Sequence, residues 1–108
     1  NLTAARIIFE AQEGHLGKVP LGQTRQHTFR FVNRGTEVLR LGNILSGCHC
    51  SVAYTQARRL EPGQGGELVA TYDPTGQPTG PFRRTLVLET NDSSQPITRL
   101  ELIGEVVP

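Results

Sequence analysis

Apolar and polar residues alternate along most of this chain, and this period of two constrains the fold more than any other feature. Between Thr24 and Asn33, for example, His27, Phe29 and Phe31 fall on one face of an extended segment. Such alternation is typical of strands with one buried face and one exposed face. Similar runs recur between turns rich in Gly and Pro, and no segment has the apolar spacing of a helix of useful length. The pattern therefore predicts an all-β fold.

Seven strands are expected from this alternation. The first strand is expected to open at Arg6–Phe9, to break at Gly14–Gly17 and to resume at Lys18–Val19. The other six are Thr24–Asn33, Val38–Leu45, Ser51–Tyr54, Glu67–Tyr72, Phe82–Thr90 and Ile97–Val106. Strands at spacings of about ten residues predict a single domain over residues 1–108, an Ig-like two-sheet antiparallel sandwich. The apolar residues expected to form its core are Phe29, Phe31, Leu39, Leu41, Leu68, Ala70, Leu86, Leu88, Leu100 and Leu102.

The charge balance and the apolar content argue against two classes of partner. The chain has 11 basic and 10 acidic residues, so its net charge is +1. Proteins that bind nucleic acids or anionic membranes carry a clear basic excess. No stretch approaches the ~20 apolar residues that span a bilayer. We therefore expect no nucleic acid partner and no membrane insertion by this segment.

The only two cysteines lie one residue apart, in the run Ser46-Gly47-Cys48-His49-Cys50-Ser51. In an extended segment, the side chains of Cys48 and Cys50 point the same way, with Cα atoms roughly 6.5 Å apart. That separation is within the upper limit for a disulfide. One interpretation is therefore structural: both cysteines are small buried residues, or a local disulfide holds a turn.

Two chemical interpretations compete with this structural one. Two thiolates favour copper or zinc, and His49, His15 or His27 would supply nitrogen, because structural zinc takes four ligands. His49 points away from its neighbours if the run is extended, which weakens it as a third ligand. A pair such as Cys48 and Cys50 also suits thiol–disulfide exchange, in which an adjacent imidazolium lowers a thiol pKa. The pair is thus a candidate for three roles: a local staple, a soft-metal site and a redox couple.

No arrangement of residues typical of an enzyme is found in the sequence. The nucleophile motif Gly-x-Ser-x-Gly is absent. The run Gly63–Gly66 lacks the Lys and the following helix of a phosphate-binding loop, so it is expected to be a turn. We therefore expect no enzymatic activity, and no cofactor other than the copper or zinc considered above.

Three separated parts of the chain resemble the motifs of a known family. They are His15-Leu16-Gly17-Lys18-Val19-Pro20-Leu21-Gly22-Gln23 with Thr28-Phe29-Arg30-Phe31-Val32-Asn33-Arg34-Gly35, then Ser46-Gly47-Cys48-His49-Cys50, and Leu60-Glu61-Pro62-Gly63 through Phe82 with Asn91-Asp92. Over residues 15–106 the chain resembles uncharacterised bacterial Ig-like domains related to Hydin-type and major-sperm-protein-like domains. The resemblance implies an exported, often lipid-anchored or multidomain β-sandwich of unknown biochemical role. The family motif is Ser-x-Cys-Gly-Cys-Thr, so His49 and Ser51 replace its Gly and Thr, and His49 adds a potential ligand.

From these features we expect a non-enzymatic, extracytoplasmic interaction or scaffold module that is periplasmic, on the cell surface or secreted. Its partner is expected to be another protein or a second copy of the chain, bound through an exposed strand edge or the end loops. The segment Asn1–Ala11 precedes the resemblance and is a candidate strand to donate to a neighbouring copy. The alternative function is copper or zinc binding, or thiol redox chemistry, at Cys48 and Cys50.

Overall fold

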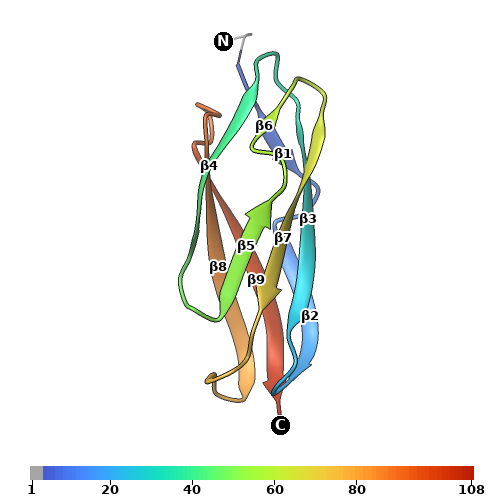
Figure 1. The fold of residues 1–108 in the computed structure, drawn as a ribbon, viewed down its shortest axis with the longest axis vertical. Helices are drawn as coiled ribbons and strands as arrows, with labels where there is room; N and C mark the ends of the chain where they lie inside the picture. Colours follow the sequence, from blue (N-terminus) through green and yellow to red (C-terminus); the bar gives the residue numbers. More distant parts are fainter. Residues whose placement is uncertain (1–3) are drawn as a thin grey trace.

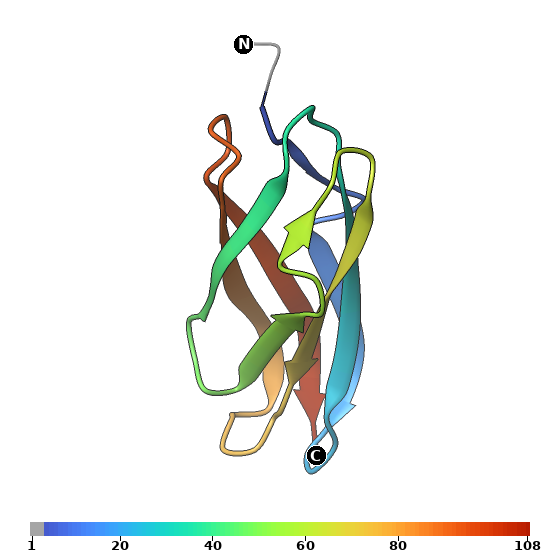
Figure 2. The ribbon, with the colours of Figure 1, turned by 45° about the horizontal axis from the view of Figure 1, so that its top comes forward.

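The computed structural model describes residues 4–108, which form nine strands in two sheets that pack face to face (Figure 1 and Figure 2). In chain order the strands are β1 (Ile7–Phe9), β2 (Glu13–Pro20), β3 (Arg25–Asn33), β4 (Leu39–Ser46), β5 (Ser51–Thr55), β6 (Arg59–Leu60), β7 (Gly65–Tyr72), β8 (Gly80–Thr90) and β9 (Ile97–Val107). The predicted all-β sandwich is confirmed, with nine strands rather than about seven. Within residues 4–108 there is no helix that could cross a membrane.

The two sheets differ in size and in the direction of one pairing. Sheet A has four strands in the order β1-β3-β7-β5, and sheet B has five in the order β2-β9-β8-β4-β6. The strand pairs of the described chain are antiparallel except β2 and β9, which run parallel from Glu13 beside Glu101 to Pro20 beside Val107. The expectation of a wholly antiparallel sandwich is therefore wrong at this edge of sheet B. This pairing joins strands from opposite ends of the chain. The alternation of apolar and polar residues within each strand does not show which strands will pair, so it could not predict this one.

The predicted strand break at Gly14–Gly17 is wrong, because β2 runs straight through it. A bulge between His15 and Gly17 shifts the register against β9. Gly17 has a φ of 68°, which glycine adopts without strain, so the strand continues where the apolar alternation is interrupted. The other unexpected strand, β6, has two residues, too few to show a period of two.

Side chains from both sheets meet in one core between them. All ten core residues predicted from the sequence are buried. The structure adds Ala5, Ile7, Val19, Cys50, Leu60, Tyr72, Phe82 and Val106. Where β7 ends and β8 begins, the rings of Tyr72 and Phe82 stack with centroids 4.1 Å apart. Burial of each large apolar side chain contributes about 2 kcal/mol, so this core is the main force that holds the sheets together.

The first strand folds back onto its own chain. β1 pairs with β3 in antiparallel register, with Ile7 opposite Asn33 and Phe9 opposite Phe31. The Ile7 amide, in turn, donates to the carboxylate of Asp92 in the β8–β9 turn, at 2.9 Å. The hypothesis that Asn1–Ala11 is donated to a neighbouring copy is therefore wrong for β1; residues 1–3 lie outside the described part of the chain.

Candidate functional site

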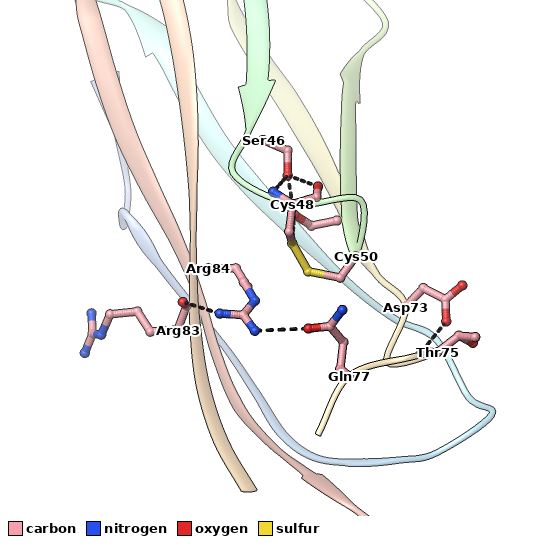
Figure 3. Close-up of a disulfide and its surroundings, with 9 residues drawn as sticks. Ser46, Cys48, Cys50, Asp73, Thr75, Gln77, Arg83 and Arg84 are labelled. Carbon is pink, nitrogen blue, oxygen red and sulfur yellow. Dashed lines mark hydrogen bonds between the residues drawn. A yellow bond between two sulfur atoms is a disulfide. The ribbon is translucent and has the colours of Figure 1, made fainter. Parts of the chain in front are cut away.

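The two cysteines lie between β4 and β5 and are joined in a disulfide (Figure 3). Their Cα atoms are 5.2 Å apart, closer than the roughly 6.5 Å expected for an extended run. The extended conformation assumed for Cys48 to Cys50 is therefore wrong, because the chain bends and turns there. Cys50 is buried in the core, and Cys48 is half-buried. The disulfide thus has an inner end and an outer end.

Two serine hydroxyls brace this cysteine turn. Ser46 Oγ donates to the carbonyl of Cys48 at 2.9 Å and accepts from the Cys48 amide at 3.4 Å. Ser51 Oγ lies 2.6 Å from Ser46 Oγ and 3.9 Å from Cys48 Sγ. The Asp73 amide donates to the carbonyl of Cys50 at 2.7 Å, which ties the turn to the end of β7. The serines that flank the cysteines in the sequence therefore have a structural role that spacing alone did not reveal.

The three histidines lie on different elements. His49 is exposed in the cysteine turn. His15 is exposed on β2, with its Nε2 atom 3.5 Å from a carboxylate oxygen of Glu13. His27 packs edge-on against Phe29, with ring centroids 4.6 Å apart, and burial, helped by the nearby His15, lowers the pKa of His27. Within residues 4–108, no three His, Cys, Asp or Glu side chains are grouped to hold a metal ion.

A second polar group lies near the disulfide (Figure 3). Arg84 donates from Nη2 to the side-chain oxygen of Gln77 at 3.1 Å. The hydroxyl of Tyr72 and the Nε of Arg84 are buried and have no hydrogen-bond partner among the described residues. Burial raises the pKa of Tyr72, although the positive Arg84 acts in the opposite direction. Tyr72 is therefore neutral near pH 7, and its ring serves the core.

Strand β5, at the edge of sheet A, lacks the features that normally protect a free strand edge. Its sequence Ser-Val-Ala-Tyr-Thr holds no charged residue, no Gly and no Pro. It pairs with β7 over all five residues without a bulge, from Ser51 opposite Tyr72 to Thr55 opposite Leu68. Charges, Pro, bulges and very short strands are the usual devices against unwanted pairing. An uncharged, regular edge strand is therefore open to pairing with another chain.

The other edges of the two sheets are protected in one of these ways. β2 carries the bulge at Gly17, together with Lys18 and Pro20. β1 has three residues and β6 has two. Beyond β6, strand β4 is bulged between Leu41 and Ile44, and the Arg58 guanidinium donates to a backbone carbonyl there. In the described part of the chain, β5 is thus the edge best suited to accept a strand.

The outer face of sheet A next to β5 is hollowed and carries exposed apolar side chains. Val52 and Tyr54 are 64% and 54% exposed, and Tyr54 stands opposite Val69 of β7. Beside them lies a hollow of about 390 Å³, and a second of about 820 Å³ adjoins it toward β1 and β3. Both hollows are lined by Gly65, which has no side chain to fill the space. An extended segment added to β5 would therefore meet the apolar Val52 and Tyr54, with the polar Gln56 and Glu67 at the hollow.

Two buried polar residues at turns, Asn33 and Asp92, hold the top of the sandwich together. Asn33 is fully buried, and its side-chain nitrogen donates to the carbonyls of Glu37 at 2.8 Å and Leu60 at 3.1 Å. The Asn33 side-chain oxygen accepts from the amides of Arg6 and Gly35. One Asn thus joins three separated segments. The signal in the sequence is the Asn-x-Gly turn, but the distant partners are not visible there.

Asp92 has the same kind of role at the β8–β9 turn. Its carboxylate accepts from the Ser94 amide at 3.0 Å and the Ser94 hydroxyl at 2.7 Å, besides the Ile7 amide. Arg6 Nη1 lies 3.3 Å from it. Burial by itself raises the pKa of Asp92, but the bonds from Ser94 and Ile7 and the positive Arg6 outweigh burial, so the pKa lies below its ordinary value. This carboxylate is a structural anchor.

Comparison with known protein families shows the family of this chain. A profile described as "Protein of unknown function (DUF1573)" matches residues 7–106. The chain belongs to the DUF1573 family. The match begins at β1 rather than near residue 15, so it includes the first strand, which the resemblance noted above left out. No curated protein matches the sequence of this DUF1573 chain.

Solved structures share the fold at low sequence identity. A protein of unknown function from Porphyromonas gingivalis W83 matches with a TM-score of 0.86 at 18% identity, over 96% of this chain and 48% of that one, so this chain spans about half its length. The ASH/PapD-like domain 7 of human CEP192 matches with a TM-score of 0.73 at 13% identity, over 96% and 87% of the two chains. The periplasmic chaperone SfaE matches with a TM-score of 0.67 at 12% identity, over 95% and 58%. The DUF1573 chain thus has a PapD-like, Ig-like sandwich fold.

Proposed function

We propose that this DUF1573 chain is a non-enzymatic, extracytoplasmic interaction or scaffold module that binds a protein by accepting a strand at β5. The observation that carries the proposal is the uncharged, regular edge of Ser51–Thr55, beside a hollowed outer face on which Val52 and Tyr54 are exposed. In strand addition, backbone hydrogen bonds supply affinity, and side chains that alternate along the added strand supply selectivity. Val52 and Tyr54 would border the outward-facing side chains of the added strand.

The groups with shifted pKa values support a role without catalysis. Active sites bring such groups together in a cleft. Here His27 packs on Phe29, Tyr72 stacks in the core, and Asp92 anchors β1. The pKa of the fourth, Asp73, is lowered by the Thr75 backbone and side chain in an exposed loop. Each of these shifts has a structural cause of its own.

The extracytoplasmic location is supported by the disulfide between Cys48 and Cys50. Disulfides persist in oxidising compartments and are rare in the reducing cytosol of most organisms. The name of SfaE, a periplasmic chaperone with the same fold, agrees with such a location. Mass spectrometry of the protein, alkylated before lysis of the source cells, tests this point: the cysteines are expected to resist alkylation, and two alkylated cysteines would contradict it.

Photo-crosslinking from position 54 tests the binding edge. A benzoylphenylalanine at Tyr54 is expected to capture a protein in cells, because that side chain borders the free edge of β5. The matched control carries the same group at Ile97, which is 55% exposed on sheet B. Adding Val52→Lys to the first variant is expected to abolish capture, since a charge protects the edge. Equal capture from both positions, or none from position 54, would refute the proposal.

A second candidate function, thiol–disulfide exchange, is favoured by the unequal burial of the two cysteines. Cys48 lines a surface hollow of about 410 Å³, whereas Cys50 is 4% exposed. A thiolate such as that of glutathione would attack Cys48 Sγ; the bond to Cys50 Sγ breaks, and Cys50 leaves as a thiolate that takes a proton from water. Glutathione trapped on Cys48, with alkylation on Cys50, is the expected result. The reverse distribution would contradict this reading.

A further inference from the structure

We propose that β5 pairs with β5 of a second copy of this chain, antiparallel, about a two-fold axis at Ala53. The inference rests on the proposed function, because it uses the same edge, and it names the partner. β5 has five residues and is one of the two edge strands of sheet A (Figure 1). The pairing would join two four-stranded sheets into one continuous sheet across a closed, symmetric interface.

The sequence of β5 is self-complementary in this register. With Ala53 on the axis, Val52 stands opposite Tyr54 of the second copy, and Ser51 stands opposite Thr55. An aromatic residue opposite a β-branched residue is a favourable cross-strand pair. Because the strand has no charge, no like charges meet at the axis.

The inner face of β5 does not select the register. Ser51 and Thr55 are 2% and 9% exposed, Thr55 Oγ1 is buried, and Ser51 Oγ already lies 2.6 Å from Ser46 Oγ. Both hydroxyls therefore stay within their own copy and add no side-chain bond across the axis. The register is selected on the outer face, where Val52 and Tyr54 are exposed.

The short edge predicts a weak dimer. Stable interfaces bury roughly 1,000 Å² or more, and two five-residue edges meet over a smaller area unless the hollowed outer face also contributes. The dimer is therefore expected to form as the protein concentration rises, or where a longer parent chain holds two copies close together.

Charge substitutions on the outer face of β5 test both the surface and the register. In Val52→Lys/Tyr54→Lys, like charges meet across the axis, and self-association is expected to fall roughly tenfold or more. In Val52→Glu/Tyr54→Lys the same apolar groups are lost, but opposite charges meet, so association is expected to recover. The control Leu45→Lys/Ile97→Lys adds the same net charge on sheet B, at residues 53% and 55% exposed, and should associate like the wild type.

Sedimentation velocity of the purified chain over a range of concentrations gives the result, and circular dichroism of each variant confirms that it folds. A wild type that stays monomeric at every concentration would overturn the proposal. So would a Glu/Lys variant that associates no better than the Lys/Lys variant, because the register would then be wrong. A monomer that still crosslinks from position 54 to a different protein would refute self-pairing and leave the proposed function standing. A wild type that stays monomeric and also captures nothing from position 54 would refute both the self-pairing and the proposed function.

Discussion

Replacement of Asp92 with alanine tests how this sandwich holds its first strand. The carboxylate is 2% exposed and accepts from the amides of Ile7 and Ser94 at 2.9 and 3.0 Å. Alanine leaves the Ile7 amide buried without an acceptor, which costs about 1–3 kcal/mol, and the lost bonds from Ser94 add about 1 kcal/mol. We therefore expect a loss of about 3 kcal/mol in the free energy of unfolding. For a chain of this length that corresponds to a melting temperature about 12–15 °C lower.

A matched control separates the long-range anchor from the local turn. Asp73 accepts from the Thr75 amide at 3.0 Å, as Asp92 accepts from Ser94, but Asp73 is exposed and has no strand to hold. Asp73→Ala should therefore change the melting temperature far less. Amide exchange across Ile7–Phe9 should speed up in Asp92→Ala alone. Equal losses in the two variants, or an unchanged β1, would refute the reasoning.

The pH dependence of the same variant has a definite sign. The pKa of Asp92 in the folded protein lies below its ordinary value of 3.8. The stability that the ionised carboxylate contributes is therefore complete above pH 3.8 and is lost as the pH falls through the lower, folded pKa. The difference in urea midpoint between wild type and Asp92→Ala should be constant near neutral pH and shrink in acid. A difference that grows in acid would show that the pKa shift has the opposite sign.

Three further predictions concern the cysteine turn and the start of β7. Reduction of the Cys48–Cys50 disulfide should lower the free energy of unfolding by only about 1–2 kcal/mol, because the closed loop is very short; melting with and without reductant checks this, and a larger loss would contradict it. Since no third ligand joins the pair in the described chain and structural zinc takes four ligands, the reduced protein should gain little zinc affinity over Cys48→Ser/Cys50→Ser, and tight zinc binding in titration would support the metal hypothesis. Gly66→Ala should destabilise by about 1–3 kcal/mol, because its Cβ would lie 2.8 Å from the Phe31 ring. Gly65→Ala, whose Cβ would lie 3.4 Å from the nearest atom, is the control in chemical denaturation, and equal losses would contradict the packing argument.

The parts of the fold that local alternation determines were predictable. The strand expected over Thr24–Asn33 is observed as Arg25–Asn33, and every predicted core residue is buried. The burial of residues such as Phe29 and Phe31 can be predicted from the strand itself, because inward and outward positions alternate within one strand. The edge character of β5 was not predictable in the same way. It depends on which strands are neighbours, and that is decided by contacts distant in sequence.

The features that the sequence analysis missed or placed wrongly depend on such distant contacts. The turn at Cys48 and Cys50 is shaped by hydrogen bonds from Ser46 and from the Asp73 amide at the far end of β7. The role of Asp92 depends on Ile7, at the other end of the chain. A pattern of residue types shows that a turn is present, but it does not show which buried amide the turn residue will bind.

Amide hydrogen exchange along β5 tests directly whether this strand is the binding edge. It should be measured on the dilute protein and again with the protein saturated by its partner, either a second copy or the protein captured from position 54. Exchange within Ser51–Thr55 is expected to slow on binding, while exchange at the edges β2 and β4 is expected to stay unchanged. Protection that appears on β2 or β4 and leaves β5 unaffected would contradict it.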